Sequence, residues 1–380
     1  MKKISVIFGT RPEAIKLAPV ILELKRFPEL FQCTVCITAQ HRQMLDQVLA
    51  TFAIVPDVDL DLMVKDQTLA GFTSRALTAL DGFLQEENPD LIIVQGDTTT
   101  VFCAALAAFY NHVPVAHVEA GLRTGNIYAP WPEEINRVLA SRLTRLHFAP
   151  TQGSCDNLLK EGVSPDSVFV TGNTVIDALL LAIEKTRSSA PPIPGLPDNN
   201  TASFEGKKIV LITGHRRENF GEGFDSICRA VAALADENPD AVFIYPVHLN
   251  PNVQEPVHRI LGNGTRKNLF LIQPLDYLPF VSLMQQSYLI LTDSGGIQEE
   301  APAIGKPVLV MRDKTERPEA LGTGTVQLVG TNEKSIITAV SALLNDPELY
   351  KQTAVKSFLY GSGTAAKQIV EILRHFFSNL

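Results

Sequence analysis

Three carboxylates in the first half of the chain are expected near the positions where parallel strands would end. Asp97 and Glu119 each close such a segment, and Glu133 lies in the first turn of a predicted helix, one turn before Arg137. Carboxylates that gather at neighbouring strand ends repel one another, which raises the pKa of at least one of them. General acid/base chemistry at neutral pH needs such a group. We therefore predict that these three residues form a catalytic cluster.

Each of these residues also has a structural interpretation. Asp97 precedes three threonines and would serve as the N-cap of the next helix. The helix dipole favours Glu133 in a first turn, and its spacing to Arg137 is that of an i,i+4 ion pair. The gathering of the carboxylates at neighbouring strand ends is what favours catalysis over these alternatives.

Positive charges lie beside the first predicted helix. Arg11 and Lys16 flank Pro12, which suits the first turn of a helix because its missing N–H is not needed there. Cations near a helix N-terminus oppose the helix dipole, so they are unfavourable unless an anion lies among them. We expect a phosphate or an acidic partner at this turn.

A second polar group is predicted in the second half of the chain. His215 and Arg216 follow a strand-like segment and precede a Gly-rich helix entrance. Ser294, Gly295 and Gly296 follow another strand, where their backbone N–H groups can bind a phosphate. We predict an anion site here, with His215 placed for proton transfer.

Two adjacent acids, Glu299 and Glu300, follow this predicted anion site. Consecutive residues on a helix point about 100° apart, so both side chains cannot face one reacting carbon. We therefore do not expect them to be the catalytic pair.

The sequence offers no support for a bound cofactor or metal. The nearest match to the dinucleotide fingerprint GxGxxG, at residues 221–226, fails at its last position. Cys33 and Cys36 lie within one strand-like segment, whose alternation would send them to opposite faces of a sheet. We expect no NAD and no metal, and we interpret these cysteines as packing residues.

Composition limits the classes of protein. A chain of 380 residues is longer than one compact core usually holds, so two domains are expected. With 33 basic and 41 acidic residues the net charge is −8, which argues against nucleic acid or an anionic membrane as a partner. No apolar run approaches the roughly 18 residues of a membrane helix, and the first one is too short for a signal peptide. We expect a cytoplasmic protein.

Short β-rich apolar segments alternate with predicted helices along the chain. Most of these segments are apolar on both faces, as in parallel strands that helices cover on each side. The alternation predicts an α/β fold with two doubly wound, Rossmann-like parallel-sheet domains, and ligands in such folds bind beyond the carboxyl ends of the strands. We expect the active site in the cleft between the domains. A breaker-rich stretch at 188–206 lies at mid-chain, and the domain crossing is expected slightly earlier, near Gly172.

Five motifs together resemble a known family. In order they are GTRPEAIKLAP, QGDTTT, HVEAGLRTGNIYAPWPEEINR, TGHRRENFGEGF and LTDSGGIQEEAPAIGKPVLVMRDKTERPE. They are similar in order and spacing to those of the bacterial non-hydrolysing UDP-N-acetylglucosamine 2-epimerases. The resemblance implies a fold like that of GT-B glycosyltransferases and a homodimer. It also implies an N-terminal domain at 1–172, a UDP-binding domain at 173–361, and a last helix at 362–380 that packs back on the first domain.

The resemblance implies the reversible conversion of UDP-GlcNAc to UDP-ManNAc. Carbon 2 of the sugar has no neighbouring carbonyl, so removal of its proton alone would give an unstabilised carbanion, and a hydride route would need NAD. The remaining route is anti elimination of UDP to 2-acetamidoglucal, followed by syn re-addition. This route needs carboxylates near the sugar, cations and N–H dipoles on the diphosphate, and a closed cleft that retains the glycal.

The resemblance also suggests roles for residues at matching positions. Asp97, Glu119 and Glu133 resemble acid/base groups, without an order among them; Arg137 resembles an orienting residue, and His215 a group that assists the leaving UDP. The positions similar to the family's substrate-binding set are Arg11, Lys16, Asp97, Glu119, His215, Leu275, Phe280, Ser294, Gly295, Gly296, Glu300 and Arg317. Those that match its allosteric site for a second UDP-GlcNAc are Gln40, Gln43, Arg216 and His248. Within the substrate set Glu300 is expected at the ribose hydroxyls, and its neighbour Glu299 is expected to be solvated or paired.

Three other functions are compatible with the same architecture. A hydrolysing 2-epimerase would release ManNAc and UDP, a GT-B glycosyltransferase would need an acceptor, and a nucleotide-sugar binding protein would do no chemistry. The carboxylate cluster argues against the last, because recognition of UDP gains nothing from three carboxylates beside a diphosphate.

Overall fold

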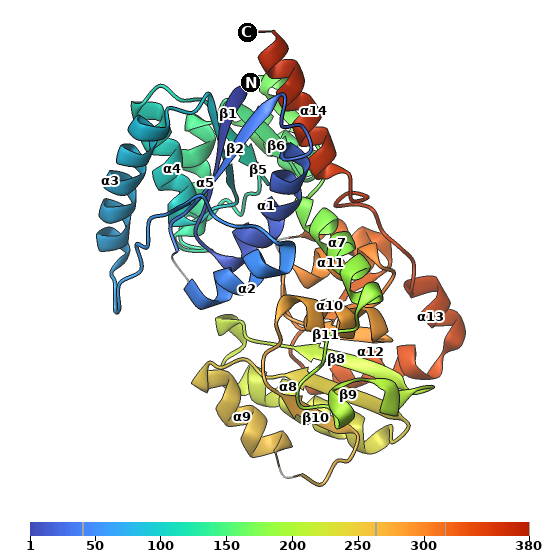
Figure 1. The fold of residues 1–380 in the computed structure, drawn as a ribbon. Helices are drawn as coiled ribbons and strands as arrows, with labels where there is room; N and C mark the ends of the chain where they lie inside the picture. The colour runs from blue at the N-terminus through green and yellow to red at the C-terminus, as the bar shows by residue number, and fades with distance from the viewer. Residues whose placement is uncertain (40–41, 263, 316, 380) are drawn as a thin grey trace. The chain divides into compact units, whose positions relative to one another are not determined.

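The computed structural model describes residues 1–39, 42–262, 264–315 and 317–379. The chain divides into two compact units, which Figure 1 draws in one colour gradient. Unit 1 holds Met1–Leu181 together with Leu359–Leu380, and unit 2 holds Ala182–Phe358. The chain first leaves unit 1 inside helix α7 (Thr174–Ser188), which begins just after Gly172.

Unit 1 is built on a seven-stranded parallel sheet in the order β3-β2-β1-β4-β5-β6-β7. Its strands are β1 (Lys2–Phe8), β2 (Phe31–Ile37), β3 (Val58–Asp59), β4 (Leu91–Gln95), β5 (Val115–Val118), β6 (Leu146–Ala149) and β7 (Val168–Val170). The order reverses between β1 and β4, as in doubly wound folds, and the ends of these strands are where a ligand is expected.

Helices connect the strands of unit 1. They are α1 (Arg11–Leu24), α2 (Arg42–Phe52), α3 (Leu69–Glu87), α4 (Thr99–Tyr110), α5 (Glu133–Leu143), α6 (Gln152–Lys160), the first part of α7, and α14 (Ala365–Ser378). Several of their starts are set by side chains that lie near the strand ends. Thr98 caps α4 by accepting a hydrogen bond from the Val101 N–H, and Thr10 with Glu13 forms a capping box on α1.

The C-terminal helix α14 belongs to unit 1, where it packs against α1 (Figure 1). Its apolar side chains Ile369, Val370 and Leu373 are buried. The Asp177 carboxylate of α7 accepts hydrogen bonds from the backbone N–H groups of Ala365 and Ala366, at 3.3 and 2.9 Å. The last helix is therefore fixed at its start by a buried polar contact and along its length by apolar packing.

Unit 2 repeats the same architecture with a six-stranded parallel sheet, in the order β10-β9-β8-β11-β12-β13. Its strands are β8 (Lys208–Thr213), β9 (Ala241–Pro246), β10 (Leu269–Ile272), β11 (Leu289–Thr292), β12 (Val308–Val310) and β13 (Val326–Leu328). Its helices are α8 (Glu222–Glu237), α9 (Pro251–Leu261), α10 (Tyr277–Gln286), α11 (Ile297–Ala303), α12 (Glu333–Asn345) and α13 (Pro347–Thr353). Here the order reverses between β8 and β11.

The apolar pattern of the sequence matches the sheets. Every residue of β4, β5, β6 and β11 is buried, as expected for strands that helices cover on both faces. The prediction of two doubly wound parallel-sheet domains is confirmed. Over the described ranges, none of the helices combines the length and apolar character that a membrane span requires.

Candidate active site

A pocket of about 580 Å³ opens in unit 1 beyond the carboxyl ends of β1, β4 and β5. This is the position at which a doubly wound sheet binds its ligands. Its lining is dominated by polar and charged residues: Thr10, Arg11, Pro12, Glu13, Lys16, Leu69, Gln95, Gly96, Asp97, Thr98, Thr99, Glu119, Pro132, Glu133 and Asn136. The predicted carboxylates and the cations of the first turn thus line one cavity.

Glu119 lies deepest among the predicted acids, with 7% of its surface exposed. Its backbone has φ +64°, a left-handed conformation that is uncommon for a residue with a side chain. The carboxylate accepts hydrogen bonds from the Lys16 ammonium at 2.6 and 2.7 Å, from the Asn173 amide at 2.9 Å, and from the Gln95 amide. These donors hold the carboxylate in one orientation at the pocket wall.

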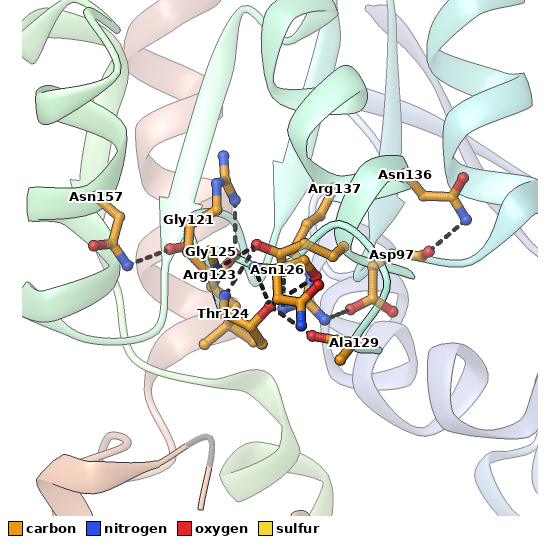
Figure 2. A network of polar contacts seen from close by, with 12 residues as sticks. Asp97, Gly121, Arg123, Thr124, Gly125, Asn126, Ala129, Asn136, Arg137 and Asn157 are labelled. Carbon is orange, nitrogen blue, oxygen red and sulfur yellow. Dashed lines mark hydrogen bonds and ion pairs between the residues drawn. The ribbon is translucent and has the colours of Figure 1, made fainter. Parts of the chain in front are cut away.

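Asp97 is held by Arg137 of α5, which donates a hydrogen bond to its Oδ2 (Figure 2). Burial raises the pKa of the Asp97 carboxyl above its ordinary value; the Arg137 charge lowers it, and the Glu119 charge raises it again. A raised pKa was expected from repulsion between the carboxylates; burial is its largest cause, and the Glu119 charge adds to it. Asp97 does not cap α4, because Thr98 is the N-cap.

Arg137 and Glu134 tie the loop before α5 to this site. Arg137 forms an ion pair with Glu134 at 3.2 Å as well as with Asp97. Glu134 also accepts hydrogen bonds from the backbone N–H groups of Thr124 and Gly125, each at 3.0 Å. Glu133, the predicted acid, lies in the pocket wall. The orienting role predicted for Arg137 therefore has a geometric basis, with Glu134 as its second partner.

Glu13 is a buried carboxyl of the pocket that the sequence reasoning missed. It accepts hydrogen bonds from the backbone N–H groups of Gly9 and Thr10, at 3.1 and 2.8 Å, and from the Thr98 hydroxyl at 2.8 Å. Burial raises its pKa from 4.5 to about 7, against the lowering effect of these donors. The signal in the sequence was the T-x-x-E spacing of a capping box.

We expect Glu13 to make folding stability depend on pH. A carboxyl whose pKa is raised on folding binds its proton more tightly in the native state, so stability falls as pH rises from about 4.5 to about 7. The full difference corresponds to roughly 3 kcal/mol. In urea unfolding at several pH values, the stability of wild type relative to Glu13→Gln should decline through this window. A difference that stays constant with pH would contradict this account, and the exposed Glu29→Gln serves as a control.

His117 holds the loop that follows β4 and carries Asp97. It is fully buried in β5, and its Nε2 lies 2.7 Å from the Gly96 carbonyl oxygen, next to Asp97. Burial lowers its pKa to about 4, so the ring is neutral near pH 7 and Nε2 carries the hydrogen. A neutral histidine therefore fixes the backbone that presents Asp97.

The second predicted site lies in unit 2, beyond the ends of β8 and β11. Asp293 is fully buried there, and its Oδ2 accepts hydrogen bonds from the backbone N–H groups of His215 and Arg216, at 2.9 and 2.8 Å. The His215 ring lies 3.7 Å from Asp293 Oδ1 and stacks on His248 with ring centroids 5.1 Å apart. Burial lowers the pKa of His215, an effect that Asp293 partly opposes. The sequence reasoning missed Asp293, although it lies within one of the quoted motifs.

Two arginines approach the Gly-Gly turn before α11. A Cβ atom built on Gly295 would lie 2.8 Å from Arg317 Nη1 and 3.5 Å from Arg216 Nη2. Arg317 donates a hydrogen bond to Glu299, which is 2% exposed. Glu299 is therefore paired, as one of the two expectations had it. Glu300 is half-buried at the start of the same helix, with its Oε1 4.0 Å from the Cβ position of Gly296.

The remaining predicted residues lie in the two units as follows. Leu275 is buried in the loop before α10, and Phe280 lies half-buried within α10. Of the predicted allosteric residues, Gln40 lies outside the described residues, and Gln43 is described only by its backbone, at the start of α2. Over the described part of the chain, no group of three or more His, Cys, Asp or Glu side chains could hold a metal ion. Cys33 and Cys36 are free thiols.

The two Rossmann-like domains place the chain among GT-B-like proteins, and comparisons with known proteins are more specific. A family model for UDP-N-acetylglucosamine 2-epimerase matches residues 23–374. The UDP-N-acetylglucosamine 2-epimerase of Escherichia coli K12 is 53% identical over 373 residues, 98% of each chain. The Neisseria meningitidis UDP-GlcNAc 2-epimerase bound to UDP-GlcNAc superposes with a TM-score of 0.88 at 50% identity, covering 98% of this chain and 100% of that one.

A more distant solved structure agrees. The Methanocaldococcus jannaschii UDP-GlcNAc 2-epimerase in complex with UDP-GlcNAc and UDP has a TM-score of 0.80 at 33% identity, with 98% of this chain and 99% of that chain covered. The chain belongs to the UDP-N-acetylglucosamine 2-epimerase family. The resemblance expected from the five motifs is confirmed.

Proposed function

We propose that this protein interconverts UDP-GlcNAc and UDP-ManNAc without hydrolysis, by anti elimination of UDP to 2-acetamidoglucal and syn re-addition. The observation that supports it most is the unit 1 pocket. There Asp97, with a raised pKa, lies beside Glu119, which an ammonium and two amides hold in one orientation. Two carboxyl groups in the same cavity, one of them with a raised pKa, are suited to proton removal and proton return at one carbon.

The elimination step balances without a cofactor. A carboxylate takes the C2 proton, the C2–H electron pair forms the C1–C2 double bond, and the C1–O bond breaks with its electrons on the β-phosphate oxygen of UDP. In re-addition that oxygen attacks C1, and a carboxyl group returns a proton to the opposite face of C2. Asp97, Glu119 and Glu133 are the proposed acid/base groups, and Arg137 keeps Asp97 in place.

Unit 2 is proposed to bind the UDP part. Ser294, Gly295 and Gly296 offer backbone N–H groups to the diphosphate, and the nearby guanidinium groups of Arg317 and Arg216 supply positive charge. His215 is proposed to assist the leaving β-phosphate. We propose further that Glu300 binds the ribose hydroxyls and that Leu275 and Phe280 lie near the uracil; Arg11 and Lys16 are the proposed cations of unit 1.

We predict that Gly295→Ala weakens UDP binding by about tenfold or more. The added methyl would lie 2.8 Å from Arg317 Nη1, so the guanidinium must move away from the turn that it covers. Isothermal titration with UDP measures the loss. Gly322→Ala is the matched control, because a Cβ at Gly322 meets no atom within 4 Å. Unchanged UDP affinity in Gly295→Ala would remove the Gly-Gly turn from the proposed diphosphate site.

Three further properties are proposed with this function. The protein is proposed to be cytoplasmic. It is also proposed to be a homodimer, and the mass of the purified chain in light scattering tests this. A second UDP-GlcNAc is proposed to activate it through Gln40, Gln43, Arg216 and His248. The stack of His248 on His215 is a direct route by which that site would act on the proposed leaving-group residue.

The proposed reaction is tested by incubating the protein with UDP-GlcNAc in D2O, without NAD and without an acceptor. NMR should show deuterium at C2 and a mixture containing UDP-ManNAc. Free ManNAc with UDP as the only products would favour a hydrolysing 2-epimerase instead. Turnover only after an acceptor is added would favour a glycosyltransferase.

A further inference from the structure

We propose that Asn173 is a positioning residue that links the chain crossing between the two units to the orientation of Glu119. This inference rests on the proposed function of Glu119. Asn173 is 2% exposed, and its Nδ2 donates a hydrogen bond to Glu119 Oε1 at 2.9 Å. It directly precedes α7, the helix within which the chain passes from unit 1 into unit 2.

The segment of unit 1 that leads into the first passage is bonded to the segment that follows the second passage. The chain returns to unit 1 at Leu359, and the Asn173 backbone N–H donates to the Tyr360 carbonyl at 2.7 Å. Gly172 and Gly361 are in backbone contact, because a Cβ on Gly172 would lie 3.0 Å from the Gly361 Cα. Glycines with positive φ at both positions permit this close approach. A change of backbone at either passage therefore acts on Asn173.

The Asn173 amide has only one orientation that satisfies its neighbours. Its Oδ1 accepts a hydrogen bond from the Val175 N–H at 3.0 Å, so its NH2 group must face Glu119. The amide thus connects the start of α7 to the carboxylate, with its oxygen accepting from α7 and its NH2 group donating to Glu119. If the start of α7 shifts, the carboxylate must either follow or lose this donor.

Titratable and charged side chains from several elements surround Glu119. They include Lys16 of α1, Asp97 after β4 and His117 of β5, and Arg137 of α5 acts on both Asp97 and His117. Glu13 lines the same pocket, and Asp177 lies one turn along α7. These groups are common to wild type and to variants at 173, so a ratio of rates isolates the effect of the residue at that position.

The test compares the rate of C2 deuterium exchange in wild type, Asn173→Asp and Asn173→Ala between pH 5.5 and 8.5. Each rate is divided by the concentration of UDP-binding sites, which titration with UDP measures. Asn173→Asp keeps the shape and the acceptor for Val175 but faces Glu119 with a second carboxylate. We expect its rate relative to wild type to be about 100-fold lower at pH 8.5 and to recover at least tenfold by pH 5.5, where the introduced carboxyl group is protonated and can donate again. Asn173→Ala should lose about 10- to 100-fold at all pH values.

Asp177→Asn is the matched control. It weakens the contact of α7 with Ala365 and Ala366 near the same crossing without touching Glu119. It should lower the thermal midpoint and leave the exchange rate per site within about twofold of wild type. A pH-independent ratio for Asn173→Asp, or an equal loss in Asp177→Asn, would overturn the positioning role. Absence of exchange in wild type would instead refute the proposed function itself.

Discussion

Glu119→Gln is expected to abolish C2 deuterium exchange, with a loss of about a thousandfold or more, while UDP binding stays within about twofold of wild type. The substitution keeps the size of the side chain but removes the charge on which the Lys16 ammonium and the Asn173 amide converge. Apart from the proposed cations Arg11 and Lys16, the groups proposed to bind UDP lie in unit 2, so affinity for UDP should depend little on this charge. Exchange by NMR and titration with UDP measure the two quantities on one protein preparation.

Glu161→Gln is the control for this prediction. Glu161 also forms an ion pair, with Arg123 at 2.7 Å, but it does not line the pocket. Its variant should keep the exchange rate. Loss of UDP affinity in Glu119→Gln, with exchange retained, would move Glu119 from chemistry to recognition.

Asp97→Asn is expected to lower turnover by about 100- to 10,000-fold, the range of a general acid or base. Burial raises the pKa of Asp97, so the group holds its proton to a higher pH than an exposed aspartate does. The protonated form is lost as pH rises through that raised pKa, and a step that needs it should slow on the alkaline side. The pH–rate profile of wild type should therefore show an alkaline limb that the residual activity of Asp97→Asn lacks.

Arg137→Met provides the complementary measurement. Removal of the guanidinium takes away the charge and the hydrogen bond of Arg137, which both lower the pKa of Asp97, while the Lys16 charge remains. The pKa of Asp97 should therefore rise further, and the alkaline limb should move to higher pH. A limb in the same place in both variants and in wild type would assign it to another group.

The fold class could be predicted because parallel strands that are buried on both faces are continuously apolar in sequence, and here such segments alternate with predicted helices. The candidate site residues were predicted for a related reason. Asp97, Glu119 and the Gly-Gly turn all follow strands directly, and strand ends meet at one edge of a doubly wound sheet.

Glu13 carried a local signal that was not used, whereas other missed residues make contacts far apart in sequence. Asn173 and Gln95 both donate hydrogen bonds to the Glu119 carboxylate. They can do so only when β4, β5 and the start of α7 lie side by side. The structural interpretation of Asp97 as an N-cap was excluded by geometry, since Thr98 occupies that position. Partner choice also needed the structure: Arg137 has the i,i+4 spacing to Glu133, yet it pairs with Asp97 and Glu134.

The central claim is that the bond between C1 and the UDP oxygen breaks in every turnover. It is tested most directly with UDP-GlcNAc that carries ¹⁸O in the bridge between C1 and the β-phosphorus. If UDP departs and re-adds, the label should move into the non-bridging oxygens of the β-phosphate at a rate comparable to epimerisation, as seen by ³¹P NMR. Epimerisation at C2 with the label retained in the bridge would contradict the account.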